Sequence, residues 1–153
     1  MGEKSAEYLK LIERFAQYER TVISRPQYFM PETAEGAEYM HSVFHGMETE
    51  VLYMFCMDAN FRLLAVEEIA QGKINAAEID AQRIIRRSLK YEPKIMVLAH
   101  NHPSGGIAYS KADELATQKL AETLKTLEIK LTDHYIVTET ELKGILTGTY
   151  MRG

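Results

Sequence analysis

An unbroken apolar stretch near the middle of the chain is the strongest constraint on its fold. The stretch reads VLYMFCM, from Val51 to Met57, and carries no charged side chain. A run of this length without alternating polar residues is typical of a β-strand that is covered on both faces. The stretch KIMVLAH, from Lys94 to His100, has the same character between its end residues. Together the two stretches predict a sheet enclosed by helices.

Hydrophobic periodicity predicts the remaining elements. A turn at residues 58–60 is expected to join the first strand to a second one at 61–69, which pairs with it as a hairpin. Further along we expect a helix at 76–91 with Ile79, Ile84, Ile85 and Leu89 facing inward, a helix at 110–127, and strands at 129–138 and 142–147. The pattern predicts a mixed sheet with helices, of α/β or α+β type.

The first 45 residues predict two helices. The first has Leu9, Ile12 and Phe15 at helical spacing, and the second follows Pro31 and ends near Gly46. No linker rich in glycine and serine separates them from the rest of the 153-residue chain. We therefore expect residues 1–45 to be helices packed on a single domain formed by residues 46–153.

Composition and charge exclude several classes of protein. The formal net charge is −4, so no overall positive field attracts nucleic acid. The single cysteine, Cys56, forms no internal disulfide and is expected to be buried, which fits a reducing cytoplasm. The charged N-terminal segment lacks a signal-peptide core, and no segment is apolar enough to span a membrane. We expect a cytoplasmic protein without a membrane partner.

Two histidines end the second apolar stretch. His100 and His102 are separated by one residue, so on an extended chain their side chains point to the same side. Pro103 and Gly105 then turn the chain, which leaves both rings at a sheet edge. Asp113 is expected in the first turn of the next helix, within reach if the intervening loop folds back. Two neutral imidazoles and one carboxylate, with a fourth position for water, are typical of a catalytic zinc site.

The segment from Ser110 to Asp113 also has an interpretation without a metal. A Ser-x-x-Asp pattern before the apolar positions of a helix is a capping box. The cap does not account for the His-x-His sequence at the end of the strand. The two interpretations are compatible, since a carboxylate at a helix N-terminus is also able to bind a cation.

These residues resemble a known family of metallopeptidases. The stretch HNHPSG at 100–105, followed by S-x-x-D at 110–113, is similar to the JAMM (MPN+) motif. Together with the Asp-His pair at 133–134 it resembles the RadC branch, and the resemblance extends over residues 24–147. It implies a three-layer αβα fold with a mixed sheet, similar to that of the cytidine deaminases.

The resemblance also implies an activity. It implies a zinc-dependent hydrolase of metallopeptidase type that cleaves an amide or isopeptide bond in a peptide or protein. The zinc ion would be held by His100, His102 and Asp113. Ser110 would hydrogen-bond the bound water or the developing oxyanion.

The family also has an acidic residue on an earlier strand. Alignment of the VLYMFCM stretch with that strand puts Glu50 at this position, and Glu48, two residues away on the same face, is the alternative. The carboxylate would accept a proton from the water and deliver it to the leaving amine. The alternative for either residue is a solvated position at a strand start.

Other polar pairs have weaker claims to a site. His41 and His45 are four residues apart on an expected helix, but Ser42 replaces the Glu of an H-E-x-x-H motif and a surface pair is favoured. Asp133 and His134 are expected to line the cleft or orient a metal ligand, or to form a satisfied pair in the core. Base deamination is excluded, because it needs P-C-x-x-C and the chain has one cysteine.

The alternative function is a DNA-associated or scaffolding module with little or no catalysis. The RadC name is linked to DNA repair, and longer relatives carry an N-terminal helix-hairpin-helix module, for which residues 1–45 are too short and too acidic. A basic stripe on the third helix would contact phosphates, although a solvated face is favoured; it consists of Arg83, Arg86, Arg87, Lys90 and Lys94. The scissile bond and self-association into a homo-oligomer stay open.

Overall fold

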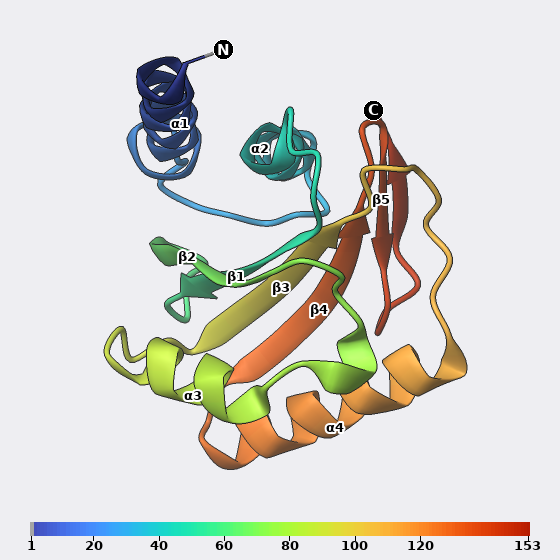
Figure 1. The fold of residues 1–153 in the computed structure, drawn as a ribbon. Coiled ribbons are helices and arrows are strands. Elements are labelled where there is room, and N and C mark those ends of the chain that lie inside the picture. The colour runs from blue at the N-terminus through green and yellow to red at the C-terminus, as the bar shows by residue number, and fades with distance from the viewer. Residues whose placement is uncertain (1) are drawn as a thin grey trace.

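A six-stranded sheet with helices on both faces forms the body of the protein (Figure 1). The computed structural model describes residues 2–153. The strands are β1 (Val51–Met57), β2 (Leu63–Gln71), β3 (Ile95–Asn101), β4 (Lys130–Val137), β5 (Glu141–Gly144) and β6 (Tyr150–Arg152). The helices are α1 (Glu3–Tyr18), α2 (Ala34–Phe44), α3 (Ala81–Leu89) and α4 (Lys111–Thr126), with a π-helical turn at Glu19–Ile23 and a 3-10 turn at Ala76–Glu78.

The sheet is mixed, as the sequence predicts. Its strand order is β2-β1-β3-β4-β5-β6, and only β3 and β4 run parallel, joined by the crossover helix α4. Every residue of β1 and β3 is buried, which confirms the two enclosed strands expected from their apolar runs. Cys56 in β1 has no exposed surface, and its burial raises the pKa of its thiol to about 12.

Alternating side chains of the central strands form two cores, one on each face of the sheet. Phe55 and Val97 pack on the α2 side together with residues of that helix. Met54 and Leu98 point to the opposite face, where α3 and α4 cover them (Figure 1). Burial of each such side chain stabilises the fold by about 1.5–3 kcal/mol.

The expected helix at 76–91 is interrupted. A 3-10 turn ends at Glu78, Ile79 has extended backbone dihedrals, and α3 begins only after Asp80. The Asp80 carboxylate accepts a hydrogen bond from the Arg83 N–H at 3.1 Å, so the side chain caps a new helix instead of continuing the old one. Leu89, expected to face inward, is exposed. The short strand β6 was not predicted.

The two N-terminal helices differ in how they meet the core. Helix α2 contributes buried residues such as Met40 and Val43, whereas α1 has no buried residue. The expectation that the apolar residues of the first helix pack on the core is therefore not met, since Leu9, Ile12 and Phe15 are exposed. Neither this helix nor any other within residues 2–153 is long and apolar enough to cross a membrane.

Candidate metal centre

The pairing of β1 with β3 brings the site residues together from distant parts of the chain. Leu52 lies opposite His100 in this antiparallel ladder. Continuing the register by two residues in each direction puts Glu50 opposite His102, just beyond the ends of the two strands. His102 is held there because its N–H donates to the Val137 carbonyl at 2.8 Å. The prediction that the side chains of His100 and His102 point to the same side is confirmed.

The three imidazole rings lie in a row in which neighbouring ring nitrogens are at hydrogen-bonding distance. His100 Nε2 lies 3.1 Å from His102 Nε2, and His100 Nδ1 lies 2.8 Å from His134 Nε2. His102 Nδ1 lies 2.8 Å from the Gly106 carbonyl oxygen. A carbonyl only accepts, so His102 Nδ1 carries the proton and, in the neutral ring, Nε2 carries a lone pair. A ligand histidine in a metal site is oriented in the same way.

Burial keeps two of these rings neutral. It lowers the pKa of His100 to about 2, and the neighbouring His134 and His102 act in the same direction. Burial lowers the pKa of His134 to about 4, while the negative charge of Asp113 acts in the opposite direction. The neutral imidazole is the form that binds a metal ion, so burial holds the His100 ring in the form that a ligand needs.

The Glu50 carboxylate lies beside the outer histidine. Its Oε1 atom is 3.6 Å from His102 Nε2, and its Oε2 atom accepts a hydrogen bond from the Ile74 N–H at 3.0 Å. Both carboxylate oxygens therefore have defined neighbours. Glu48, the alternative, is exposed. Of the two acidic residues considered from the sequence, the structure places Glu50 against the imidazole row.

Asn101, which sequence reasoning did not single out, fixes the position of Glu50. Its Oδ1 accepts a hydrogen bond from the Val51 N–H at 2.7 Å, and its Nδ2 donates to the Thr49 carbonyl at 3.0 Å. These are the residues on either side of Glu50. The available signal was a buried amide between two histidines at the end of an apolar strand, because such a group needs partners.

Asp113 forms the expected capping box through one carboxylate oxygen, and its other oxygen has no hydrogen-bond partner. Its Oδ2 accepts from the Ser110 N–H, and Ser110 Oγ accepts from the Asp113 N–H, both at 3.0 Å. The other carboxylate oxygen, Oδ1, is buried without a hydrogen-bond partner. Because the Asp113 charge acts on His134, this carboxylate lies near the imidazole row as well as at its helix end.

The donors fit zinc by their chemistry, although they do not close around a common point. Within residues 2–153, no three His, Cys, Asp or Glu side chains converge in an arrangement that would hold a metal ion. Two nitrogens bound tetrahedrally to zinc at about 2.0–2.1 Å lie about 3.3 Å apart. The Nε2 atoms of His100 and His102 are separated by 3.1 Å, a distance at which facing lone pairs repel unless a cation or proton lies between them. The unpartnered Asp113 Oδ1 is a third suitable donor.

Asp133 and His134, for which the sequence left several roles open, have different partners in the structure. Asp133 Oδ1 accepts from the N–H groups of His134 and Leu146, both at 2.8 Å, and its Oδ2 accepts from the Thr147 hydroxyl. Asp133 is thus a satisfied core residue that anchors the segment after β5. The His134 ring instead contacts His100, and its Nδ1 is buried without a partner.

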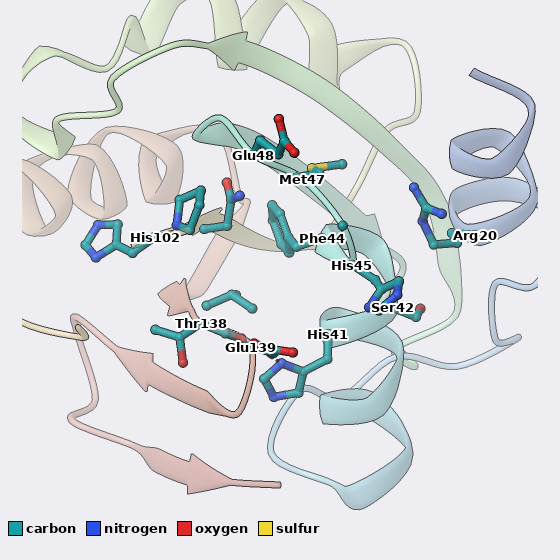
Figure 2. A pocket seen from close by; sticks show the side chains of 14 residues that line it. Arg20, His41, Ser42, Phe44, His45, Met47, Glu48, His102, Thr138 and Glu139 are labelled. Carbon is teal, nitrogen blue, oxygen red and sulfur yellow. Dashed lines mark hydrogen bonds between the residues drawn. The ribbon is translucent and has the colours of Figure 1, made fainter. Parts of the chain in front are cut away.

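A cavity of about 700 Å³ opens beside this site (Figure 2). His102 lies at one end and Arg20 at the other, and side chains of α2 form the wall between them. His41 and His45 belong to this wall. His41 Nδ1 lies 3.0 Å from the Thr138 carbonyl oxygen, and His45 is exposed. The pair therefore lines the cavity, with one ring bound to backbone and the other at the surface.

The basic stripe on α3 is partly neutralised. Glu67 Oε1 lies 3.6 Å from Arg87 Nη1 and 3.5 Å from Lys90 Nζ. Asp80 borders the same shallow hollow. Acidic partners of this kind favour a solvated face over a phosphate-binding surface.

Comparison with known proteins shows which family this chain is similar to. Residues 30–145 match the RadC-like JAB domain. The UPF0758 protein YeeS of Escherichia coli K12 is 32% identical over 136 residues, which cover 89% of this chain and 88% of YeeS. A UPF0758 protein of Nitrosococcus oceani is 35% identical over 111 residues, 72% of this chain and 49% of that relative. One from Stenotrophomonas maltophilia K279a is 36% identical over 101 residues, 66% of this chain and 43% of the relative. The chain thus spans about half the length of these longer relatives, and none of the names states an activity.

Proposed function

Because the chain belongs to the RadC-like JAB domain family, we propose that it is a zinc-dependent hydrolase that cleaves an amide or isopeptide bond. The observation that carries this proposal is the imidazole row, in which the Nε2 atoms of His100 and His102 lie 3.1 Å apart next to the Glu50 carboxylate. A buried imidazole with a lowered pKa, in a row of rings that ends beside a carboxylate and a cavity, is typical of a catalytic site.

His100, His102 and Asp113 would hold the metal ion. The two rings would each supply a ring nitrogen, and the partnerless Oδ1 of Asp113 would supply a carboxylate oxygen. When bound, zinc supplies Lewis acidity and lowers the pKa of a coordinated water to about 7. His134 and the Gly106 carbonyl contact the Nδ1 atoms of the His100 and His102 rings, which would leave both Nε2 atoms available to the ion.

Glu50 would act first as general base and then as general acid. Its carboxylate accepts a proton from the attacking water and delivers that proton to the leaving amine. The Ile74 N–H and the Asn101 side chain keep this carboxylate beside His102. Ser110, at the start of α4, would donate a hydrogen bond to the developing oxyanion. That donation is compatible with the capping box, because Ser110 Oγ only accepts there.

The cavity that leads away from His102 supports a peptide or protein substrate. Its wall combines apolar side chains such as Phe44 with polar ones such as Thr138 and Glu139 (Figure 2). A groove of about 700 Å³ has room for several residues of extended chain. A cytoplasmic location, which suits a buried reduced thiol, is part of the proposal.

Metal analysis together with a substrate screen tests the proposal. The purified protein is expected to hold about one equivalent of zinc, and the double variant His100→Ala, His102→Ala to hold almost none. Glu50→Gln should retain zinc and lose turnover of peptide and isopeptide substrates by roughly 10²–10⁴-fold. Glu48→Gln is the matched comparison: it should retain zinc and, because Glu48 lines the cavity and does not contact the imidazole row, it should lower turnover far less than Glu50→Gln does.

Two results would contradict the proposal. The first is a protein that binds less than about half an equivalent of zinc under any loading condition, unaffected by removal of both histidines. The second is turnover that survives in Glu50→Gln but is lost in Glu48→Gln, since this would exchange the roles of the two carboxylates.

A further inference from the structure

We propose that the apolar face of α1 is a self-association surface that packs against the same face of a second copy of this chain. The face consists of large apolar side chains that are all exposed in the single chain: Tyr8, Leu9, Leu11, Ile12, Phe15, Tyr18, Val22 and Ile23. It continues from α1 into the π-helical turn that follows. Figure 1 shows α1 standing clear of the sheet. The inference does not depend on the metal site.

The α1 face points away from the body of the protein. Gln17 Nε2 donates to the Tyr53 hydroxyl at 2.6 Å and lies 3.3 Å from the Val43 carbonyl oxygen, so the Gln17 side of the helix faces the core. Thr21, one turn further along, is buried on this side. Phe15 lies two residues before Gln17, on nearly the opposite side of a helix with 3.6 residues per turn. The helix therefore contacts its own domain through polar groups and turns its apolar groups to water.

A helix in this position needs a partner for its apolar face. It has 16 residues and none of them is buried. Helices of about 12–15 residues are marginally stable alone in water, and most of their stability in proteins comes from packing of an amphipathic face. Monomeric soluble proteins also rarely expose contiguous apolar patches larger than a few hundred Å².

The charges of α1 favour a protein partner over a membrane or a nucleic acid. Within the helix, three acidic residues (Glu3, Glu7, Glu13) balance three basic ones (Lys4, Lys10, Arg14). Helices that lie on membranes carry polar faces rich in Lys and Arg, and nucleic-acid surfaces need a positive excess. A face on a helix without net charge is able to meet its own copy without repulsion.

The spacing of the exposed side chains fits a second helix. Within α1, Tyr8, Leu11, Phe15 and Tyr18 are separated by three, four and three residues, which is the pattern of a helix-to-helix seam. Two copies related by a two-fold axis present the same patch to each other. From their exposure, the eight residues of the face together present on the order of 800 Å² to solvent, which is the area per partner of a standard stable interface.

Mass measurement in solution tests the proposal. The full chain at micromolar concentration is expected to sediment with twice its mass of 17.5 kDa. The variant Ile12→Ser, Phe15→Ser should shift the equilibrium to 17.5 kDa without loss of the folded circular dichroism signal, because both side chains are about 60% exposed. The matched control, Lys10→Ser with Arg14→Ser, alters the polar side of the same helix and should remain a dimer.

A disulfide trap reports which surfaces meet. Cys56 is buried, so a cysteine introduced at Leu11 would be the reactive thiol and should cross-link two copies on mild oxidation, whereas one at Lys10 should not. A protein that stays monomeric at all concentrations up to about 100 micromolar would overturn the proposal. So would a dimer that survives the Ile12→Ser, Phe15→Ser change, or a monomer that binds phosphatidylcholine–phosphatidylglycerol vesicles through the α1 face.

Discussion

At the scale of single residues, His134 determines which nitrogen of His100 is available to a metal ion. His100 Nε2 binds a cation only if the ring proton is on Nδ1, and the Nδ1–H group then donates a hydrogen bond to His134 Nε2, 2.8 Å away. The remaining His134 proton is on Nδ1, which is buried without a partner in the field of the Asp113 charge. Three residues on different elements are thus linked by one choice of tautomer.

We therefore predict that His134→Phe weakens zinc binding by roughly 10–100-fold, the usual loss when the outer partner of a ligand histidine is removed. The phenyl ring fills the space of the imidazole but accepts no hydrogen bond from His100 Nδ1. The dissociation constant is measured by competition with a chromophoric chelator. Tyr135→Phe is the control, since Tyr135 is the next residue and packs in the core on the opposite face. Equal affinity in the wild type and His134→Phe would contradict the prediction.

At the scale of elements, the start of β4 is tied to the end of β5 through Asp133. A Cβ on Gly144 would lie 2.0 Å from Asp133 Oδ2, so only glycine allows this close approach of the two strands. The same carboxylate holds the backbone of Leu146 and of His134, the residue that contacts His100. The last hairpin therefore helps to hold the site in place.

Gly144→Ala is predicted to lower the free energy of unfolding by about 1–3 kcal/mol, the usual cost of forcing extra volume into a packed site. The reason is displacement of the Asp133 carboxylate from its hydrogen bonds. Urea denaturation followed by circular dichroism measures the change. Gly153→Ala is the control, because a Cβ there would meet nothing within 4 Å. Equal midpoints for the wild type and Gly144→Ala would show that the strands have room to move apart.

The elements also show how far local sequence patterns determine this fold. The enclosed strands β1 and β3 were predicted correctly because their apolar runs need cover on both faces. The interruption before α3 was missed because the competition between Asp80 as a cap and Asp80 as a helix residue depends on tertiary packing. The outward direction of the α1 face was missed for a related reason: amphipathic spacing defines an apolar side but not what covers it.

The candidate site was predictable to the extent that it is local in the sequence. The His100 and His102 pair and the Asp113 cap follow from spacing and helix-capping rules. The roles of Asn101 and His134 depend on pairing between strands that are distant in the chain, which periodicity does not encode. Glu50 was reached through family resemblance, and its contact with Ile74 is visible only in the structure.

At the scale of the whole molecule, burial of the imidazole row links folding to protonation. Burial lowers the pKa of His134 to about 4 in the folded chain, whereas an unfolded histidine titrates near 6.5. The unfolded chain therefore binds a proton at a higher pH than the folded chain. The resulting stability is fully present above about pH 6.5 and is lost as the pH falls toward 4.

We predict that the metal-free protein loses about 2–3 kcal/mol of unfolding free energy from this group between pH 7 and pH 4. Burial lowers the pKa of His100 further, to about 2, so its contribution continues to decline below pH 4. Urea denaturation with a chelator present, repeated across this range, measures the slope. His134→Phe isolates the effect, because the carboxylates that also titrate there are common to both proteins. The wild type should lose more stability on acidification than the variant, and parallel curves would mean that His134 is solvated or already charged in the fold.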